Sequence, residues 1–129
     1  MKKLFFITLI FTTSLVLGQT RITKDQVTTG ENGLKLYNSQ PFTGVIYVNH
    51  KNGKVWKEGA YEDGKMQGLS KGYYESGQLW FEQDILDGQY IYIKKWHENG
   101  QLMSEQHYKK SRVSSYKEWD QEGNLLKEE

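Results

Sequence analysis

The sequence predicts an all-β fold, a single-layer antiparallel β-meander of repeated hairpins. Glycine is frequent and proline rare, with 13 Gly against 1 Pro, and 14% of residues are aromatic. This composition suits short strands joined by tight turns better than helices. The apolar fraction is 36% of 129 residues, which is too low for a thick two-layer core. Glycines that follow a polar residue recur every 23 or 24 residues, which indicates a repeated unit.

The first 18 residues have the pattern of a secretory signal peptide. Met1 to Lys3 form a short basic start, Leu4 to Leu17 are an apolar run diluted only by Thr and Ser, and Gly18 ends it. The run is shorter than the ~20 residues needed to cross a bilayer, so a retained membrane anchor is the less favoured alternative. We therefore expect residues 1–18 to be a Sec-type signal peptide and the mature protein to be periplasmic or extracellular.

The mature chain is nearly neutral in charge. Cleavage after Gly18 removes two lysines and no acid, which leaves 15 basic and 16 acidic residues, a net charge of −1. This balance argues against a nucleic-acid partner and gives no general attraction to anionic lipid. The chain has no cysteine, so its stability must come from packing and from the hydrogen bonds of the sheet.

Periodic glycines define the organisation of the mature chain. Residues 19–40 are expected to form an N-terminal linker with a partial strand, and residues 41–129 to hold the repeats. The units are placed near 44–66, 68–90, 91–113 and 114–129. Each unit's first turn falls at Gly53, Gly77, Gly100 or Gly123. Its second turn falls at Gly64 or Gly88, or at Lys110-Ser111 in the third unit. Asn-Gly and Asp-Gly are typical of type I′ turns, in which both central residues need φ > 0.

The turn positions predict which residues lie opposite each other. If the first turns are two-residue loops, the aromatic pairs are Tyr73 with Trp80, Trp96 with Met103, and Trp119 with Leu126. The same register pairs Lys71 with Glu82, Lys94 with Glu105, and Lys117 with Glu128. Pairs of both kinds stabilise a sheet. The register is therefore internally consistent.

Alternation along each strand predicts two apolar faces. One face is expected to carry Val55, Leu79, Leu102 and Leu125 with Tyr61, Ile85 and Tyr108, and the other Trp56, Trp80, Met103 and Leu126. The spacing from Gly64 to Gly77 is 13 residues, whereas Gly88 to Gly100 is 12. A one-residue difference reverses the faces, so we expect a β-bulge or a three-residue loop between Gly88 and Ile93.

These residues resemble the variant form of the MORN repeat (membrane occupation and recognition nexus). The pattern of an aromatic residue, a Gly two residues before a Leu, and a Glu is present from Tyr73 to Gly88, where it ends in Asp87-Gly88, and from Trp96 to Tyr108, after which Lys110-Ser111 replaces Asp-Gly. Pro41 to Gly44 is similar to the opening of the first repeat. The resemblance implies an elongated single-layer antiparallel sheet. Relatives of this kind are often labelled antitoxin-type proteins, a role that fits poorly with an exported chain.

Catalytic interpretations receive little support from the sequence. His50, His97 and Asp120 occupy the same repeat position as Tyr74, and a position that accepts Tyr, His and Asp indicates a strand surface rather than a ligand site. The chain lacks a His pair or Cys/His cluster with metal-ligand spacing, and the glutamates recur with the fold. We expect no catalytic residue, no metal site and no cofactor.

Aromatic stripes are the candidate partner-binding surface. The residues expected to contribute are Tyr73, Trp80, Trp96, Met103, Trp119 and Leu126. A protein-binding or scaffold module is favoured, because such stripes and sheet edges bind proteins. A peripheral lipid-binding surface and a glycan-binding surface remain the alternatives, and a purely structural role for the rings is also open. Self-association through the C-terminal edge is expected to use Leu125 to Glu129.

Overall fold

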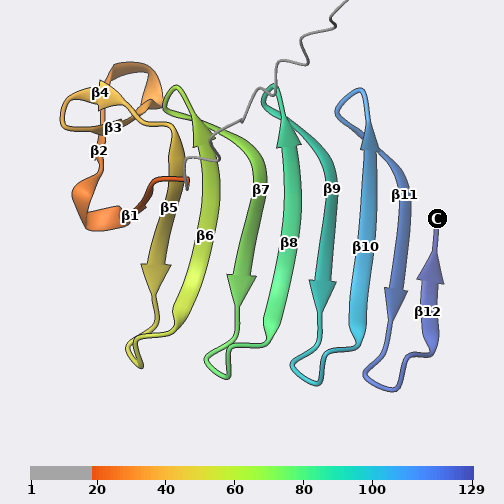
Figure 1. Cartoon of the computed structure of the whole chain (residues 1–129). Coiled ribbons are helices and arrows are strands. Elements are labelled where there is room, and N and C mark those ends of the chain that lie inside the picture. The colour runs from red at the N-terminus through yellow and green to blue at the C-terminus, as the bar shows by residue number, and fades with distance from the viewer. Residues whose placement is uncertain (1–18) are drawn as a thin grey trace, which may run out of the picture.

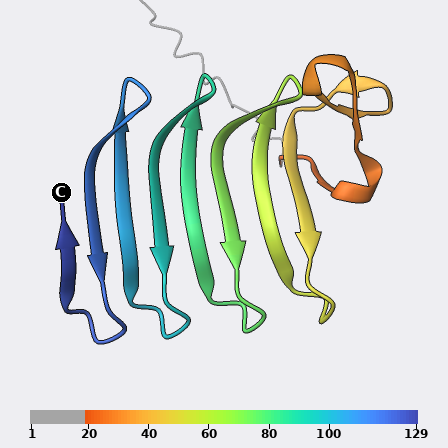
Figure 2. The same ribbon diagram turned by 180° about the vertical axis from the view of Figure 1, so that it is seen from behind.

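The computed structural model describes residues 19–129. The expected signal peptide, residues 1–18, lies outside the described residues. Nine strands stand side by side in one layer, and β5 to β12 follow each other as an antiparallel meander (Figures 1 and 2). The predicted all-β fold and antiparallel meander are therefore confirmed. Among residues 19–129, no helix is long and apolar enough to cross a bilayer.

The repeat strands are mostly eight or nine residues long and joined by short turns. They are β5 (Gly44–Asn49), β6 (Val55–Glu62), β7 (Lys65–Tyr73), β8 (Leu79–Leu86), β9 (Gln89–Trp96), β10 (Leu102–Lys109), β11 (Arg112–Trp119) and β12 (Leu125–Glu128). The ninth strand, β1 (Arg21–Thr23), pairs parallel with β5, so the sheet is mixed at this end.

The segment before β5 folds into a small cap. It contains β1, the 3-10 helices η1 (Lys24–Gln26) and η2 (Glu31–Gly33), and a second sheet of β2 (Thr28–Thr29), β3 (Lys35–Tyr37) and β4 (Gln40–Pro41). Ile22 and Phe42 from this cap, each 5% exposed, pack against Ile46 of β5. The main buried cluster thus lies where the cap meets the first hairpin, and the rest of the sheet is thin.

The second turn of each hairpin has the predicted type. Both residues have positive φ in Asp63-Gly64 (49° and 80°), in Asp87-Gly88 (50° and 74°) and in Lys110-Ser111 (49° and 60°). These values fit type I′ turns, whose twist matches that of the flanking strands. The type I′ prediction is confirmed at these turns.

The first turn of each hairpin differs from the prediction. The Gly77 amide donates to the Tyr74 carbonyl and the Tyr74 amide to the Gln78 carbonyl, both at 2.9 Å. Only the glycine has positive φ, 91° at Gly77 and 87° at Gly100. This is a three-residue loop, a type I turn followed by a left-handed glycine. The two-residue loops expected at Ser76-Gly77 and Asn99-Gly100 are wrong.

A β-bulge follows each of these loops and changes the aromatic pairing. Tyr73 lies opposite Leu79, while Gly72 lies opposite Phe81, so Trp80 is the extra residue. Trp96 likewise lies opposite Leu102 and Trp119 opposite Leu125. The predicted pairs Tyr73–Trp80, Trp96–Met103 and Trp119–Leu126 are therefore wrong. Beyond the bulges the predicted charge pairs are confirmed, as Lys71 with Glu82, Lys94 with Glu105 and Lys117 with Glu128.

Bulges near the second turns explain the uneven glycine spacing. Asp84 lies opposite Tyr92 and Ile85 opposite Tyr90, so Ile91 is an extra residue in β9. The bulge predicted between Gly88 and Ile93 is confirmed. The β6–β7 pairing contains a larger shift, between Gly59 and Tyr61, beside Gly68 with φ of 89°. This second irregularity accounts for the longer spacing in that hairpin.

Candidate interaction surfaces

Each face of the sheet has its own side-chain chemistry. We call the side that carries Glu58, Glu82, Glu105 and Glu128 the glutamate face. The opposite side is the cap face, because the cap packs against it at Ile46 and Tyr61. The bulges decide which aromatic residues belong to which face.

The bulged residues project from the cap face. The rings of Trp80 and Phe81 are 5.2 Å apart and edge-to-face, although the two residues are adjacent in sequence. Residues that alternated across the sheet would point to opposite sides, so the bulge turns Trp80 to the side of Phe81. Gly72 lies opposite Phe81, whose ring fills the space that a side chain would occupy there. Trp56, Met103 and Leu126 are the corresponding extra residues in β6, β10 and β12.

The six predicted partner-binding residues are therefore divided. Tyr73, Trp96 and Trp119 lie on the glutamate face, each opposite a leucine. Trp80, Met103 and Leu126 lie on the cap face. The expected grouping of Leu79 with Ile85 on one face is wrong, because the bulge at Trp80 separates them. The structure forms no single stripe from all six residues.

Ion pairs and tyrosine hydroxyls cover the strand centres on the glutamate face. Lys71 Nζ is 3.4 Å from Glu82, Lys94 Nζ is 3.2 Å from Glu105, and Lys117 Nζ is 2.8 Å from Glu128. In the first hairpin the corresponding partner is Arg21 of the cap, 2.8 Å from Glu58. Each repeated glutamate therefore has a basic partner, an arrangement that suits a structural ladder.

Two tyrosines complete this ladder. Tyr73 donates to Glu58 at 2.9 Å and Tyr92 donates to Glu82 at 2.7 Å. The pKa of each phenol is raised to about 12. Burial is the larger cause, and the hydrogen bond to the glutamate is the second. Both hydroxyls therefore remain donors throughout the neutral range. A hydrogen bond from His107 lowers the pKa of Glu105, against the opposing effect of burial.

Side chains link successive first-turn loops along the end of the sheet where these loops lie. His50 donates to the Tyr73 carbonyl at 2.8 Å, Tyr74 to the Trp96 carbonyl at 2.8 Å, and His97 to the Trp119 carbonyl at 3.0 Å. A carbonyl only accepts, so both histidines carry their proton on Nε2. Asn52 and Asn99 make parallel bonds to Glu75 and Gln121. The position that accepts His and Tyr is thus a structural donor to the next hairpin.

This loop ladder predicts a graded effect of substitution at His97. His97→Ala removes the bond to the Trp119 carbonyl, and we expect it to lower the free energy of unfolding by about 1 kcal/mol. His97→Tyr should recover most of this loss, because Tyr74 makes the same bond one repeat earlier. Urea denaturation measures both. An alanine variant as stable as the parent would show that the bond contributes nothing.

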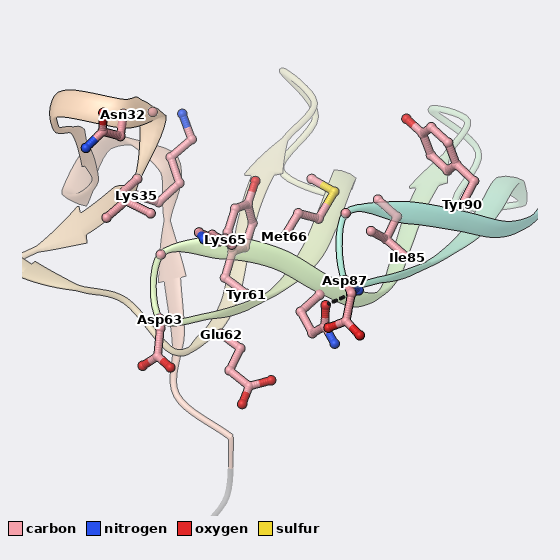
Figure 3. A pocket seen from close by; sticks show the side chains of 15 residues that line it. Asn32, Lys35, Tyr61, Glu62, Asp63, Lys65, Met66, Ile85, Asp87 and Tyr90 are labelled. Carbon is pink, nitrogen blue, oxygen red and sulfur yellow. Dashed lines mark hydrogen bonds between the residues drawn. The ribbon is translucent and has the colours of Figure 1, made fainter. Parts of the chain in front are cut away.

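A wide groove runs along the cap and the second-turn ends of the hairpins. It has a volume of about 1130 Å³ and is walled by Asn32 and Lys35 of the cap and by Tyr61, Met66, Ile85 and Tyr90 of the sheet (Figure 3). Asp63, Lys65 and Asp87 lie along its rim. A smaller pocket lies next to it, also between the cap and the cap face. The sequence interpretation missed both, because it treated residues 19–40 as a linker.

Fold and repeat together define a β-hairpin repeat protein with a single-layer sheet. The family model described as the MORN repeat variant matches residues 66–85 and 89–110. These segments cover β7 and β8, then β9 and β10, the units from which the resemblance was inferred. Residues 66–110 therefore resemble MORN repeat variants, and proteins built from such repeats generally act in binding and scaffolding. No curated protein matches the sequence.

Proposed function

We propose that this chain is an exported, non-catalytic protein-binding module whose partner docks on the glutamate face beside β12. The observation that carries the proposal is a row of three aromatic–leucine pairs, Tyr73–Leu79, Trp96–Leu102 and Trp119–Leu125. The row runs along the loop end of the glutamate face to the edge strand, where Leu125 is 51% exposed. Aromatic side chains supply much of the binding energy in protein contacts.

Edge strand β12 indicates what kind of partner segment would fit. It pairs with β11 on one side only within the described chain, and Leu125 and Leu126 are 51% and 62% exposed. An extended segment of another protein would add to this edge by backbone hydrogen bonds. Its side chains would then meet Trp119 and Leu125 on one face. Export is part of the proposal through the pattern of residues 1–18, and a co-exported protein is the expected partner.

Lipid binding is a less favoured function for this face. The ammonium groups of Lys71, Lys94 and Lys117 are each within 3.4 Å of a glutamate oxygen. Anionic headgroups are attracted by clusters of free basic side chains, and these lysines are already paired. Glycan stacking on Trp96 and Trp119 is the other alternative. Both are outcomes that the following experiment distinguishes.

The test compares tryptophans on the two faces of the sheet. A partner captured with the mature chain from the exported fraction is titrated with Trp96→Ala, Trp119→Ala and, as the matched control on the cap face, Trp80→Ala. We expect Trp96→Ala and Trp119→Ala each to weaken binding about 30-fold, since an aromatic anchor contributes ~2 kcal/mol. Trp80→Ala should leave the affinity unchanged.

Two other results would contradict the proposal. Folded Trp96→Ala and Trp119→Ala variants that keep the parent's affinity would show that the row is only structural. A loss of vesicle or glycan binding in these variants, with protein capture unchanged, would assign the face to lipid or sugar. Light scattering on the same samples identifies the case in which the partner is a second copy of this chain.

A further inference from the structure

An apolar pocket lies between the cap and the first two hairpins. Its volume is about 310 Å³, near the lower limit of the ~300–1,000 Å³ that is usual for ligand pockets. Its apolar wall consists of Val27, Ile46, Val48, Tyr61 and Met66. It opens on the cap face and is separate from the aromatic row of the glutamate face.

Small residues in the first units create the space. Gly59 lies opposite Ser70, and both line the pocket. The next residues along the same row across the sheet are larger, namely Gln83, Ile93 and Gln106. Ser70 is 7% exposed, and its hydroxyl donates to the Glu58 carbonyl at 3.1 Å. The Ser70 hydroxyl thus donates its proton within the sheet, and the floor of the pocket remains apolar.

Three lysines stand at the rim of this pocket. Lys24 and Lys35 come from the cap and Lys57 from β6. None of the three has a carboxylate within 4.0 Å among residues 19–129. Lys35 Nζ donates to Thr29 Oγ1 at 2.9 Å, and Lys57 Nζ lies 4.3 Å from the centre of the Trp56 ring. The rim therefore has excess positive charge above an apolar floor.

The one acidic residue that lines the pocket does not neutralise this charge. Glu58 contributes to the wall. Its carboxylate, however, accepts from Arg21 at 2.8 Å and from Tyr73 at 2.9 Å on the glutamate face. An anion in the pocket would consequently lie among lysine side chains, without a carboxylate directed at it.

We infer that this pocket binds a small aliphatic monocarboxylate. The tail packs against Ile46, Tyr61 and Met66, and the carboxylate lies at the rim among the lysines. A neutral amphiphile of the same length would leave the ammonium groups without an anionic partner, and a cationic one would be repelled. This site is additional to the proposed protein-binding row and does not depend on it.

Decanoate is the probe for the first test. Isothermal titration calorimetry of the whole mature chain should show saturable binding of one decanoate. Decanol should bind about tenfold more weakly, because the charge interactions at the rim together correspond to ~1.4 kcal/mol. Nuclear Overhauser contacts between decanoate methylenes and the Met66 methyl group locate the ligand. Absence of binding, or equal binding of decanol, would overturn the inference.

Filling the pocket provides the second test. A Cβ on Gly59 would lie 3.4 Å from Ser70 Oγ and 3.6 Å from the Met66 methyl carbon, which are ordinary contacts. Gly59→Leu should therefore fold and should weaken decanoate binding at least tenfold. The matched control is Gln83→Leu, two strands further along the same row and outside the pocket. Equal affinities of these two variants would place the ligand elsewhere.

The two cap lysines provide a variant pair that does not disturb the floor of the pocket. Lys24→Ala and Lys35→Ala should each weaken decanoate binding about twofold, since three such charge interactions together account for the tenfold preference over decanol. Lys95→Ala is the control, since Lys95 is exposed and lies opposite Phe81, outside the pocket. Unchanged affinity in both cap variants would contradict the charge component even if decanoate binds.

Discussion

Gly44→Ala is expected to lower the free energy of unfolding by about 3 kcal/mol or more. Gly44 begins β5 with φ of 147°, a conformation that a residue with a side chain rarely adopts. A Cβ there would overlap the Thr20 carbonyl oxygen and lie 2.6 Å from Phe42 Cζ. The carbonyl is fixed by the Val45 amide, which donates to it at 2.8 Å, so neither neighbour is free to move away. Urea denaturation of the mature chain measures the loss.

Gly53→Ala separates the two causes of this loss. Gly53 has φ of 85°, but its Cβ would meet no atom within 4 Å. Its substitution should therefore cost only the backbone conformation, about 1 kcal/mol. The difference between the two variants measures the close packing of the cap on β5. Equal losses would show that the cap does not press against Gly44 in solution.

Phe42→Ala is the second large effect, with an expected loss of about 3–5 kcal/mol. Phe42 is 5% exposed, packs with Ile22 and Ile46, and meets the Tyr37 ring edge-to-face at 6.1 Å. Its removal leaves a cavity in the main buried cluster. Thermal and urea unfolding should both record the loss.

Phe81→Ala is the matched control within the repeats. Phe81 is only half-buried and lies over Gly72 on the cap face, so less apolar surface returns to water when it is truncated. We expect this variant to lose clearly less stability than Phe42→Ala. A larger loss at Phe81 would contradict the conclusion that the core is concentrated at the cap.

The centres of the repeat strands were predictable from the sequence. Lys71 with Glu82 and Lys94 with Glu105 were paired correctly because charge and spacing agree there. The register at the strand ends was not predictable, because the sequence Ser76-Gly77 is compatible both with a two-residue turn and with a type I turn followed by a left-handed glycine. That one-residue difference is absorbed by the bulge at Trp80. Sequence alternation alone therefore placed Leu79 on the same face as Ile85, although the two lie on opposite faces.

The cap was beyond prediction for a different reason. Its strands have two or three residues each, too few for a period to be visible. The pairing of β1 with β5 is parallel and joins segments that share no turn signal. The small side chains of Gly59 and Ser70 do indicate the pocket, because larger residues, Gln83 and Gln106, occupy the later positions of the same cross-strand row. This indication becomes interpretable only once the register places these residues under the cap.

Side-chain nuclear Overhauser contacts of Trp96 test the central claim, that bulges divide the aromatic residues between two faces. The account predicts contacts from the Trp96 indole to the Leu102 methyl groups and none to the Met103 methyl group. It also predicts contacts between the Trp80 and Phe81 rings, which are 5.2 Å apart. Contacts from Trp96 to Met103 and from Tyr73 to Trp80 would contradict it and restore a single stripe on one face.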